Sequence, residues 1–191
     1  MARGDHSKQL VALLRAFGTQ PILGVEIGVH RGETSARLLR DIRSLSLFMV
    51  DIWAPPNADS SYVKVKDPCA LQSSTRFQEN RKNAIRITDF AKSRRIVLQK
   101  DSSAALGALP AFLDFCFIDA DHSYEGCLRD LRAYWPRIRS EGLFSGHDYY
   151  DPEHRTVKHT AGVGEAVDDF FAEQGLDFSV GKGSVWWCWK P

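Results

Sequence analysis

The chain has 191 residues, of which 43% are hydrophobic and 26% are charged, as in an ordinary globular domain. Its 25 Lys and Arg residues almost balance its 24 Asp and Glu residues, so the formal net charge is +1. A charge so close to zero argues against a protein that coats nucleic acid or an anionic membrane surface. We therefore expect one domain over residues 1–191 that works on small molecules, with no nucleic acid and no membrane as partner.

The cysteines and the N-terminus favour a cytoplasmic location. No C-x-x-C spacing is present, so we expect four reduced thiols, at Cys69, Cys116, Cys127 and Cys188. The N-terminus lacks the apolar core of a signal peptide. No apolar run reaches the roughly 18 residues that a membrane span needs.

Hydrophobic periodicity predicts an alternation of strands and helices along the chain. Helices are expected over residues 10–17, 33–42, 71–91, 104–109, 128–135 and 163–171. Strands are expected over residues 21–26, 45–50, 95–98, 115–118 and from 143–145, followed by a hairpin of 178–180 with 184–189. This order predicts a doubly wound, Rossmann-like α/β sheet that is mostly parallel and ends in an antiparallel C-terminal hairpin.

Two polar segments are too long to be simple connections. Residues 52–70 are rich in Pro, Asp, Ser and Lys, and residues 149–162 are polar and turn-rich. Long loops inside a compact domain are usually functional. We expect a lid loop at 52–76 and a second active-site loop at 149–162.

Ligands of such sheets bind beyond the carboxyl ends of the strands, where the first candidate segment lies. After the first strand, Glu26, Gly28 and Gly32 form a glycine-containing turn before a helix N-terminus, which suits a carboxylate or phosphate. Val29 and His30 occupy the place of the middle glycine of a dinucleotide-binding motif. This departure argues against a nicotinamide dehydrogenase.

Acidic residues also follow the second and third strands. Asp51 is placed to accept hydrogen bonds from both hydroxyls of a ribose. Asp101, followed by Ser102, is placed to accept from an exocyclic amine such as that of adenine, or to cap a helix. The two interpretations of Asp101 are compatible with each other.

The densest group of titratable residues follows the fourth and fifth strands. Asp119, Asp121 and His122 come after the fourth strand, and His147 and Asp148 after the fifth. Neighbouring parallel strands bring these ends together, so Asp119, His147 and Asp148 are candidate ligands of one divalent ion, with His122 as a base. The same cluster would also suit a metal-dependent hydrolase.

From about Pro21 to the C-terminus, the chain resembles the class I S-adenosylmethionine-dependent methyltransferases. It is most similar to the small bacterial branch related to macrocin-type sugar O-methyltransferases and, more distantly, to the catechol-type enzymes. The resemblance rests on residues 26–32 (EIGVHRG), 101–102 (DS), 117–125 (FIDADHSYE) and 146–149 (GHDY), and on Asp51.

The resemblance implies S-adenosylmethionine as the cofactor. The cofactor-binding residues that it implies are Glu26, Gly28, Val29, His30, Gly32, Thr34, Asp51, Ile52, Asp101, Ser102 and Asp119. The catalytic residues that it implies are Asp119, Asp121, His122 and Tyr124, with His122 at the position of the family's base.

A divalent metal, Mg²⁺ or Mn²⁺, is implied at Asp119, His147 and Asp148. The relatives usually carry Asp or Glu where this chain has His147, and imidazole suits Mn, Fe, Ni or Zn better than Mg. Three alternatives remain open: a different metal, a His147 that does not bind it, or a reaction without metal.

The implied reaction is methyl transfer to an oxygen of a small molecule, and a sugar is one candidate acceptor. A homodimer is one candidate assembly. The alternatives are a metal-dependent hydrolase and a non-catalytic domain that binds the cofactor. The hydrolase leaves the turn at Gly28 and the acids Asp51 and Asp101 unexplained.

Overall fold

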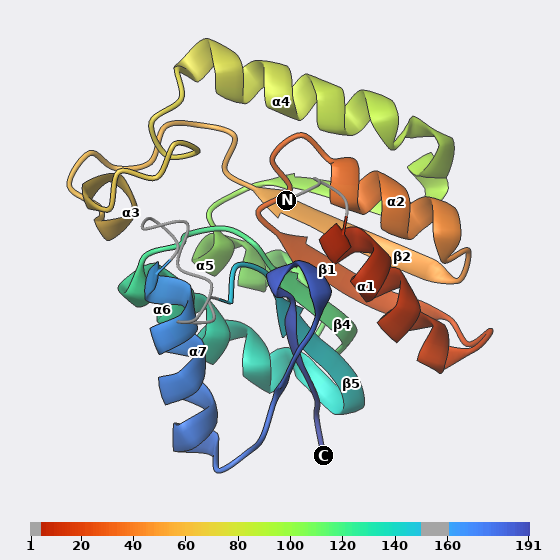
Figure 1. The fold of residues 1–191 in the computed structure, drawn as a ribbon. Coiled ribbons are helices and arrows are strands. Elements are labelled where there is room, and N and C mark those ends of the chain that lie inside the picture. The colour runs from red at the N-terminus through yellow and green to blue at the C-terminus, as the bar shows by residue number, and fades with distance from the viewer. Residues whose placement is uncertain (1–4, 150–160) are drawn as a thin grey trace.

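The structure is a computed structural model in which residues 5–149 and 161–191 are described (Figure 1). The strands are β1 (Ile22–Ile27), β2 (Leu45–Asp51), β3 (Arg95–Gln99), β4 (Leu113–Ile118), β5 (Ile138–Gly146), β6 (Ser179–Val180) and β7 (Trp186–Trp189). The α-helices are α1 (Asp5–Leu14), α2 (Glu33–Asp41), α3 (Ser61–Lys64), α4 (Ser74–Ile87), α5 (Ser102–Ala105), α6 (Tyr124–Tyr134) and α7 (Ala161–Gln174).

The strands form one sheet in the order β3-β2-β1-β4-β5-β7-β6. Strands β1 to β5 pair in parallel, and β7 pairs antiparallel with both β5 and β6. The predicted doubly wound sheet with an antiparallel C-terminal end is therefore confirmed. The strand order reverses between β1 and β4, which places the topological switch point, where such sheets bind ligands, at the carboxyl ends of these two strands.

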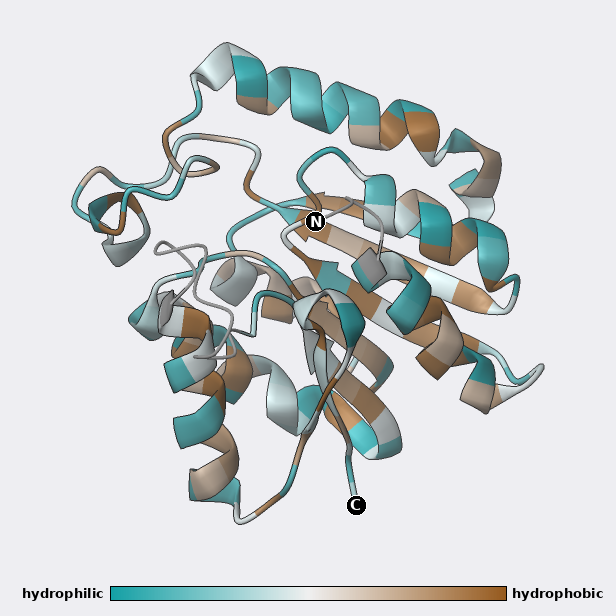
Figure 2. Ribbon diagram, viewed as in Figure 1, coloured by the Kyte–Doolittle hydropathy of each residue, from teal (hydrophilic) through white to brown (hydrophobic). Residues whose placement is uncertain are grey.

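Two apolar clusters cover the two faces of the sheet. Successive side chains of β4 alternate between them, with Cys116 in the first cluster and Phe117 in the second. Leu131 of α6 and Phe170 of α7 pack in the first cluster, and Leu10 of α1 packs in the second. Figure 2 shows the hydrophobic strands between helices whose outer surfaces are hydrophilic.

Several boundaries differ from the expected ones because capping residues fix them. Helix α4 begins at Ser74 rather than 71, since the Ser73 hydroxyl accepts a hydrogen bond from the backbone N–H of Arg76. Helix α5 begins before residue 104, since the Asp101 carboxylate accepts from the N–H of Ser103. The loop expected at 52–76 contains α3, and β5 begins five residues before the apolar residues at 143–145.

The four cysteines are free thiols, as predicted, and three of them are buried. Within residues 5–149 and 161–191, no helix combines the length and apolarity that crossing a bilayer requires.

Candidate active site

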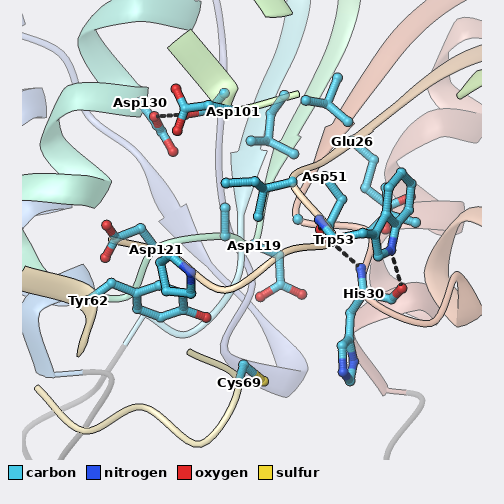
Figure 3. A pocket seen from close by; sticks show the side chains of 18 of the residues that line it. Glu26, His30, Asp51, Trp53, Tyr62, Cys69, Asp101, Asp119, Asp121 and Asp130 are labelled. Carbon is cyan, nitrogen blue, oxygen red and sulfur yellow. Dashed lines mark hydrogen bonds between the residues drawn. The ribbon is translucent and has the colours of Figure 1, made fainter. Parts of the chain in front are cut away.

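A cavity of about 600 Å³ lies at the carboxyl ends of β1, β2 and β4 (Figure 3). Its volume is within the usual range for small-molecule and cofactor sites. Ten of the eleven predicted cofactor-binding residues line it: Glu26, Gly28, Val29, His30, Thr34, Asp51, Ile52, Asp101, Ser102 and Asp119. The residues that the resemblance implied, most of them at or near strand ends, therefore come together around one cavity.

The turn after β1 requires glycine at two positions for different reasons. Gly28 has φ +89°, and an added Cβ would lie 2.0 Å from the carbonyl oxygen of Asp119. The turn therefore passes directly over the end of β4. Gly32 has φ +85°, and its added Cβ would lie 2.7 Å from the Cα of Ala84. Gly32 does not line the cavity; it allows α2 to pack closely against α4.

Glu26 is buried at the end of β1, where the Ser35 hydroxyl donates a hydrogen bond to its carboxylate. Burial raises the pKa of Glu26 to about 8, and the bond from Ser35 only partly opposes this effect. The carboxyl is therefore largely protonated at neutral pH in the cofactor-free protein. A protonated Glu26 supplies a hydrogen-bond donor to the cavity as well as an acceptor.

Asp51 fixes the backbone at the start of the loop that follows β2. One carboxylate oxygen accepts from the backbone N–H of His30 and the other from that of Trp53, both at 2.7 Å. The Trp53 indole in turn donates to the carbonyl of His30 at 2.8 Å (Figure 3). Burial raises the pKa of Asp51 to about 6, against the lowering effect of these backbone bonds.

A second acidic group lies at the other end of the cavity from Cys69 in the view of Figure 3. The Ser102 hydroxyl donates to Asp130 on α6 at 2.6 Å, and the second carboxylate oxygen of Asp130 is buried without a hydrogen-bond partner. Burial raises the pKa of Asp130 to about 6. Sequence reasoning did not single out Asp130, although its position between the apolar Leu128 and Leu131 was a signal of burial.

The predicted metal and base residues come together beside the cavity. Nε2 of His122 lies 3.5 Å from Asp119 and 3.2 Å from Asp148. Nδ1 of His147 lies 3.4 Å from a carboxylate oxygen of each of the same two acids. Two imidazoles therefore face one pair of carboxylates, as the adjacency of β4 and β5 predicted.

The charges of this cluster are strongly coupled. Burial alone would raise the pKa of Asp119, but His147 and His122 hold that pKa well below its usual range. Burial lowers the pKa of each imidazole, but the surrounding carboxylates more than compensate, and the pKa is about 10 for His122 and about 11 for His147. Without another cation, both rings are protonated at neutral pH.

Sequence reasoning also missed Asp67, which the loop after β2 brings to His122. Asp67 is 1% exposed, and its carboxylate accepts from Nδ1 of His122 at 2.6 Å. The Tyr62 ring packs against the His122 ring in an edge-to-face arrangement, with 6.0 Å between the ring centroids. No feature of the local sequence distinguishes Asp67 from the other polar residues of the loop.

The two remaining predicted catalytic residues have different positions. Asp121 lines the cavity, but one of its carboxylate oxygens accepts from the backbone N–H and the hydroxyl of Ser123 at the start of α6. Tyr124 does not line the cavity, and its hydroxyl donates to Asp169 at 2.8 Å on the surface. Most of the second predicted loop, residues 150–160, lies outside the described residues.

The N-terminal helix, for which the sequence predicted no role, also contributes to the cavity. His6 and Ser7 line it, and the His6 ring lies 4.5 Å from that of His147, centroid to centroid. Nε2 of His6 is also 2.8 Å from the hydroxyl of Thr34 at the start of α2. Helix α1 therefore connects the cofactor side of the cavity with the carboxylate cluster.

Comparisons with known proteins agree with this geometry. CalS11, a calicheamicin methyltransferase, is 15% identical with a TM-score of 0.72, over 96% of this chain and 78% of that one. The O-methyltransferase NovP is 18% identical with a TM-score of 0.70, over 97% and 78%. An O-methyltransferase from Bacillus cereus, solved with S-adenosylhomocysteine (SAH), is 16% identical with a TM-score of 0.64, over 100% and 83%.

These similarities establish the fold, and a match to a family establishes the activity. No curated protein sequence matches the chain significantly. The family described as "Methyltransferase domain" matches residues 25–149, which run from the second half of β1 to just beyond β5 and include every strand end that borders the cavity. The chain therefore belongs to this family of methyltransferase domains and is an S-adenosylmethionine-dependent methyltransferase.

Proposed function

We propose that the protein transfers the methyl group of S-adenosylmethionine to an oxygen of a small molecule, beside Asp119 and Asp148. The observation that carries this proposal is the pair of carboxylates flanked by His122 and His147, next to the cavity that the cofactor residues line. Removing the proton of a hydroxyl requires such a group, whereas binding a cofactor does not.

Residues at different strand ends bind different parts of the cofactor. Asp51, with a carboxylate oriented by two backbone N–H groups, is the acceptor for the ribose hydroxyls. Asp101 and Ser102 lie with Asp130 at the end of the cavity that suits the adenine. Gly28 lets the backbone come close to the rest of the cofactor. When bound, the cofactor supplies a methyl group on a sulfonium.

The affinity for SAH should fall as the pH falls through about 6. Asp51 has a raised pKa of about 6, and only its ionised form makes charge-assisted hydrogen bonds to ribose hydroxyls. Protonation weakens these bonds, so we expect affinity to drop about tenfold between pH 7 and pH 5. Titration calorimetry with SAH measures this profile.

The variant Asp51→Asn serves as the matched control for this profile. The amide of Asn has a similar shape to the carboxylate but does not ionise. The affinity of this variant for SAH should therefore be weaker at pH 7 and nearly constant between pH 7 and pH 5. An equally steep pH profile in Asp51→Asn would assign the effect to another group that titrates in this range, such as Asp130.

The donor set beside the cavity fits a divalent cation. The described residues Asp119, His122 and Asp148 each offer one ligand atom, and these atoms lie within 4.8 Å of one another. The buried Nε2 of His122 has no hydrogen-bond partner, as expected of a nitrogen that faces a cation. When bound, a divalent cation would lower the pKa of the acceptor hydroxyl. The imidazole of His147, which faces the same two carboxylates, would be placed to receive the proton.

The acceptor, the location, the lid and the assembly complete the proposal. A sugar hydroxyl is the candidate that the likeness to macrocin-type enzymes supports, and the free cysteines are compatible with the cytoplasm. The loop at 52–76 acts as the lid, since Trp53, Tyr62 and Cys69 from it line the cavity. A homodimer would cover the exposed apolar side chains of Val65 and Leu71.

Calorimetry and methyl transfer together test this function. We expect SAH and S-adenosylmethionine to bind with dissociation constants well below about 1 mM. Labelled methyl should pass from S-adenosylmethionine to at least one member of a panel of sugars, phenols and other hydroxyl compounds. Binding weaker than millimolar for both ligands would refute the proposal. Tight binding with label transfer to nitrogen or sulfur acceptors alone would refute the oxygen acceptor.

The two alternative functions that the sequence left open explain fewer features of the site. A metal-dependent hydrolase is not favoured, because it leaves the turn at Gly28 and the oriented Asp51 without a purpose and the family match points elsewhere. A non-catalytic binding domain would have no use for the carboxylates and imidazoles gathered beside the cavity.

A further inference from the structure

His122, which lies between the end of β4 and the start of α6, is held at Nδ1 by a residue of the lid loop. Its Nδ1 lies 2.6 Å from a carboxylate oxygen of Asp67, and the other carboxylate oxygen of Asp67 accepts from the N–H of Cys69 at 2.6 Å. A carboxylate accepts hydrogen bonds, so Nδ1 carries a proton, and a cation that displaces the second ring proton would meet the lone pair of Nε2. Asp67 thus determines both the tautomer and the direction of the ring.

Nε2 of His122 points into the carboxylate pair and not into open space. It is buried without a hydrogen-bond partner, 3.5 Å from Asp119 and 3.2 Å from Asp148. Two donor atoms that bind the same ion at about 2.1 Å in adjacent positions lie about 3 Å apart. The nitrogen is therefore spaced from both oxygens as a neighbouring ligand of one ion, and the three donor atoms lie within 4.8 Å of one another.

His147, which the resemblance assigned to the metal, also faces the two acids, with Nδ1 3.4 Å from an oxygen of each, but its other contacts differ from those of His122. Its ring packs against that of His6 on α1, at 4.5 Å between centroids. The group of donor atoms that lie within 4.8 Å of one another contains His122 and not His147. Moreover, imidazoles that bind metals usually donate their second N–H to a carboxylate, and Asp67 is that carboxylate for His122.

We propose that Asp119, His122 and Asp148 bind a divalent transition-metal ion and that Asp67 is the positioning residue that orients His122 toward it. The role of the ion in catalysis rests on the proposed function, whereas the binding of the ion is argued from the geometry of these residues. One nitrogen and two carboxylate ligands favour Mn²⁺ over Mg²⁺, which prefers oxygen ligands alone. The loop at 52–76 thereby becomes part of the metal site.

The ligand assignment is tested with the metal-free protein titrated with Mn²⁺ and followed by electron paramagnetic resonance. Spin-echo modulation from a directly bound imidazole nitrogen should be present in the wild type and in His147→Ala. It should be absent in His122→Ala, with affinity at least tenfold weaker. Mg²⁺ should compete poorly. Modulation that survives in His122→Ala and disappears in His147→Ala, or no binding of Mn²⁺ by the wild type, would overturn the assignment.

The role of Asp67 is tested by its isosteric variant in the same experiment. Loss of the partner that orients a ligand weakens metal binding about 10- to 100-fold, so Asp67→Asn should bind Mn²⁺ that much less tightly. Asp59→Asn changes an exposed residue of the same loop and should bind Mn²⁺ as the wild type does. Equal affinity in Asp67→Asn and Asp59→Asn would show that Asp67 does not orient the ligand.

Binding of SAH, measured on every variant, separates the two proposals. Each variant that is folded should bind SAH within a few-fold of the wild type, because Asp51 and Gly28 are unchanged. Normal binding of SAH without binding of Mn²⁺ refutes only the metal site. Failure of the wild type to bind SAH refutes the proposed function, whatever Mn²⁺ does.

Discussion

His122→Ala should lower methyl transfer by about 10²- to 10⁴-fold, the range for loss of a group that assists proton removal. The imidazole lies 3.2 Å from Asp148 and 3.5 Å from Asp119, so its loss removes either a proton acceptor or a group that holds a cation there. Binding of SAH should change little, because the residues for ribose and adenine lie at the ends of β2 and β3. Initial rates and calorimetry on the same preparation measure both effects.

Tyr124→Phe provides the matched comparison. Tyr124 follows His122 by two residues, but its hydroxyl donates to Asp169 on the surface and does not face the cavity. We expect its rate to stay within about twofold of the wild type, in the range of ordinary surface substitutions. Wild-type activity in His122→Ala would refute a catalytic role for the ring, and a large loss in Tyr124→Phe would restore the role that the sequence gave to Tyr124.

Gly28→Ala should destabilise the protein and abolish tight binding of the cofactor. The added methyl group would lie 2.0 Å from the carbonyl oxygen of Asp119, which belongs to the backbone and moves only if the end of β4 moves. We expect a cost of about 2–6 kcal/mol, which combines about 1–3 for a strained φ with about 1–3 for overpacking. The shift of Asp119 should also reduce methyl transfer. Urea denaturation and calorimetry with SAH measure the two losses.

Gly175→Ala separates the cost of a strained backbone from the cost of steric overlap. Gly175 also has a positive φ, of +64°, but no atom lies within 4 Å of its added Cβ. Its substitution should cost about 1–2 kcal/mol and leave the affinity for SAH unchanged. If Gly28→Ala costs no more than Gly175→Ala and binds SAH normally, the turn at β1 does not need the close approach that we infer.

The carboxylate cluster and the cofactor cavity share Asp119, which explains why this residue belongs to three of the predicted sets. Its backbone carbonyl lies under Gly28, it lines the cavity, and its side chain faces His122 and His147. In the proposed reaction, the end of β4 would therefore fix the place of methyl transfer relative to the cofactor. Helix α1 adds a further connection, since His6 contacts both Thr34 and His147.

Much of the fold could be predicted because its signals are local. Apolar runs such as that of β4 mark buried parallel strands, and the switch point follows from strand order. The acids Asp51, Asp101 and Asp119 lie at the ends of strands or within two residues of them, so the architecture alone brings them to one edge. Boundaries were less accurate because single capping bonds, such as that of Ser73, decide where a helix begins.

The sequence by itself determined the sheet, the edge at which the cavity lies and the residue types of the carboxylate and imidazole cluster, because these follow from periodicity and from chain order. Only the tertiary structure decided which residues contact one another across long loops. Asp67 meets His122 across 55 positions of sequence, and no local pattern records that contact. The direction of the His122 ring follows from it, because an imidazole takes its tautomer and orientation from the partner of its second nitrogen.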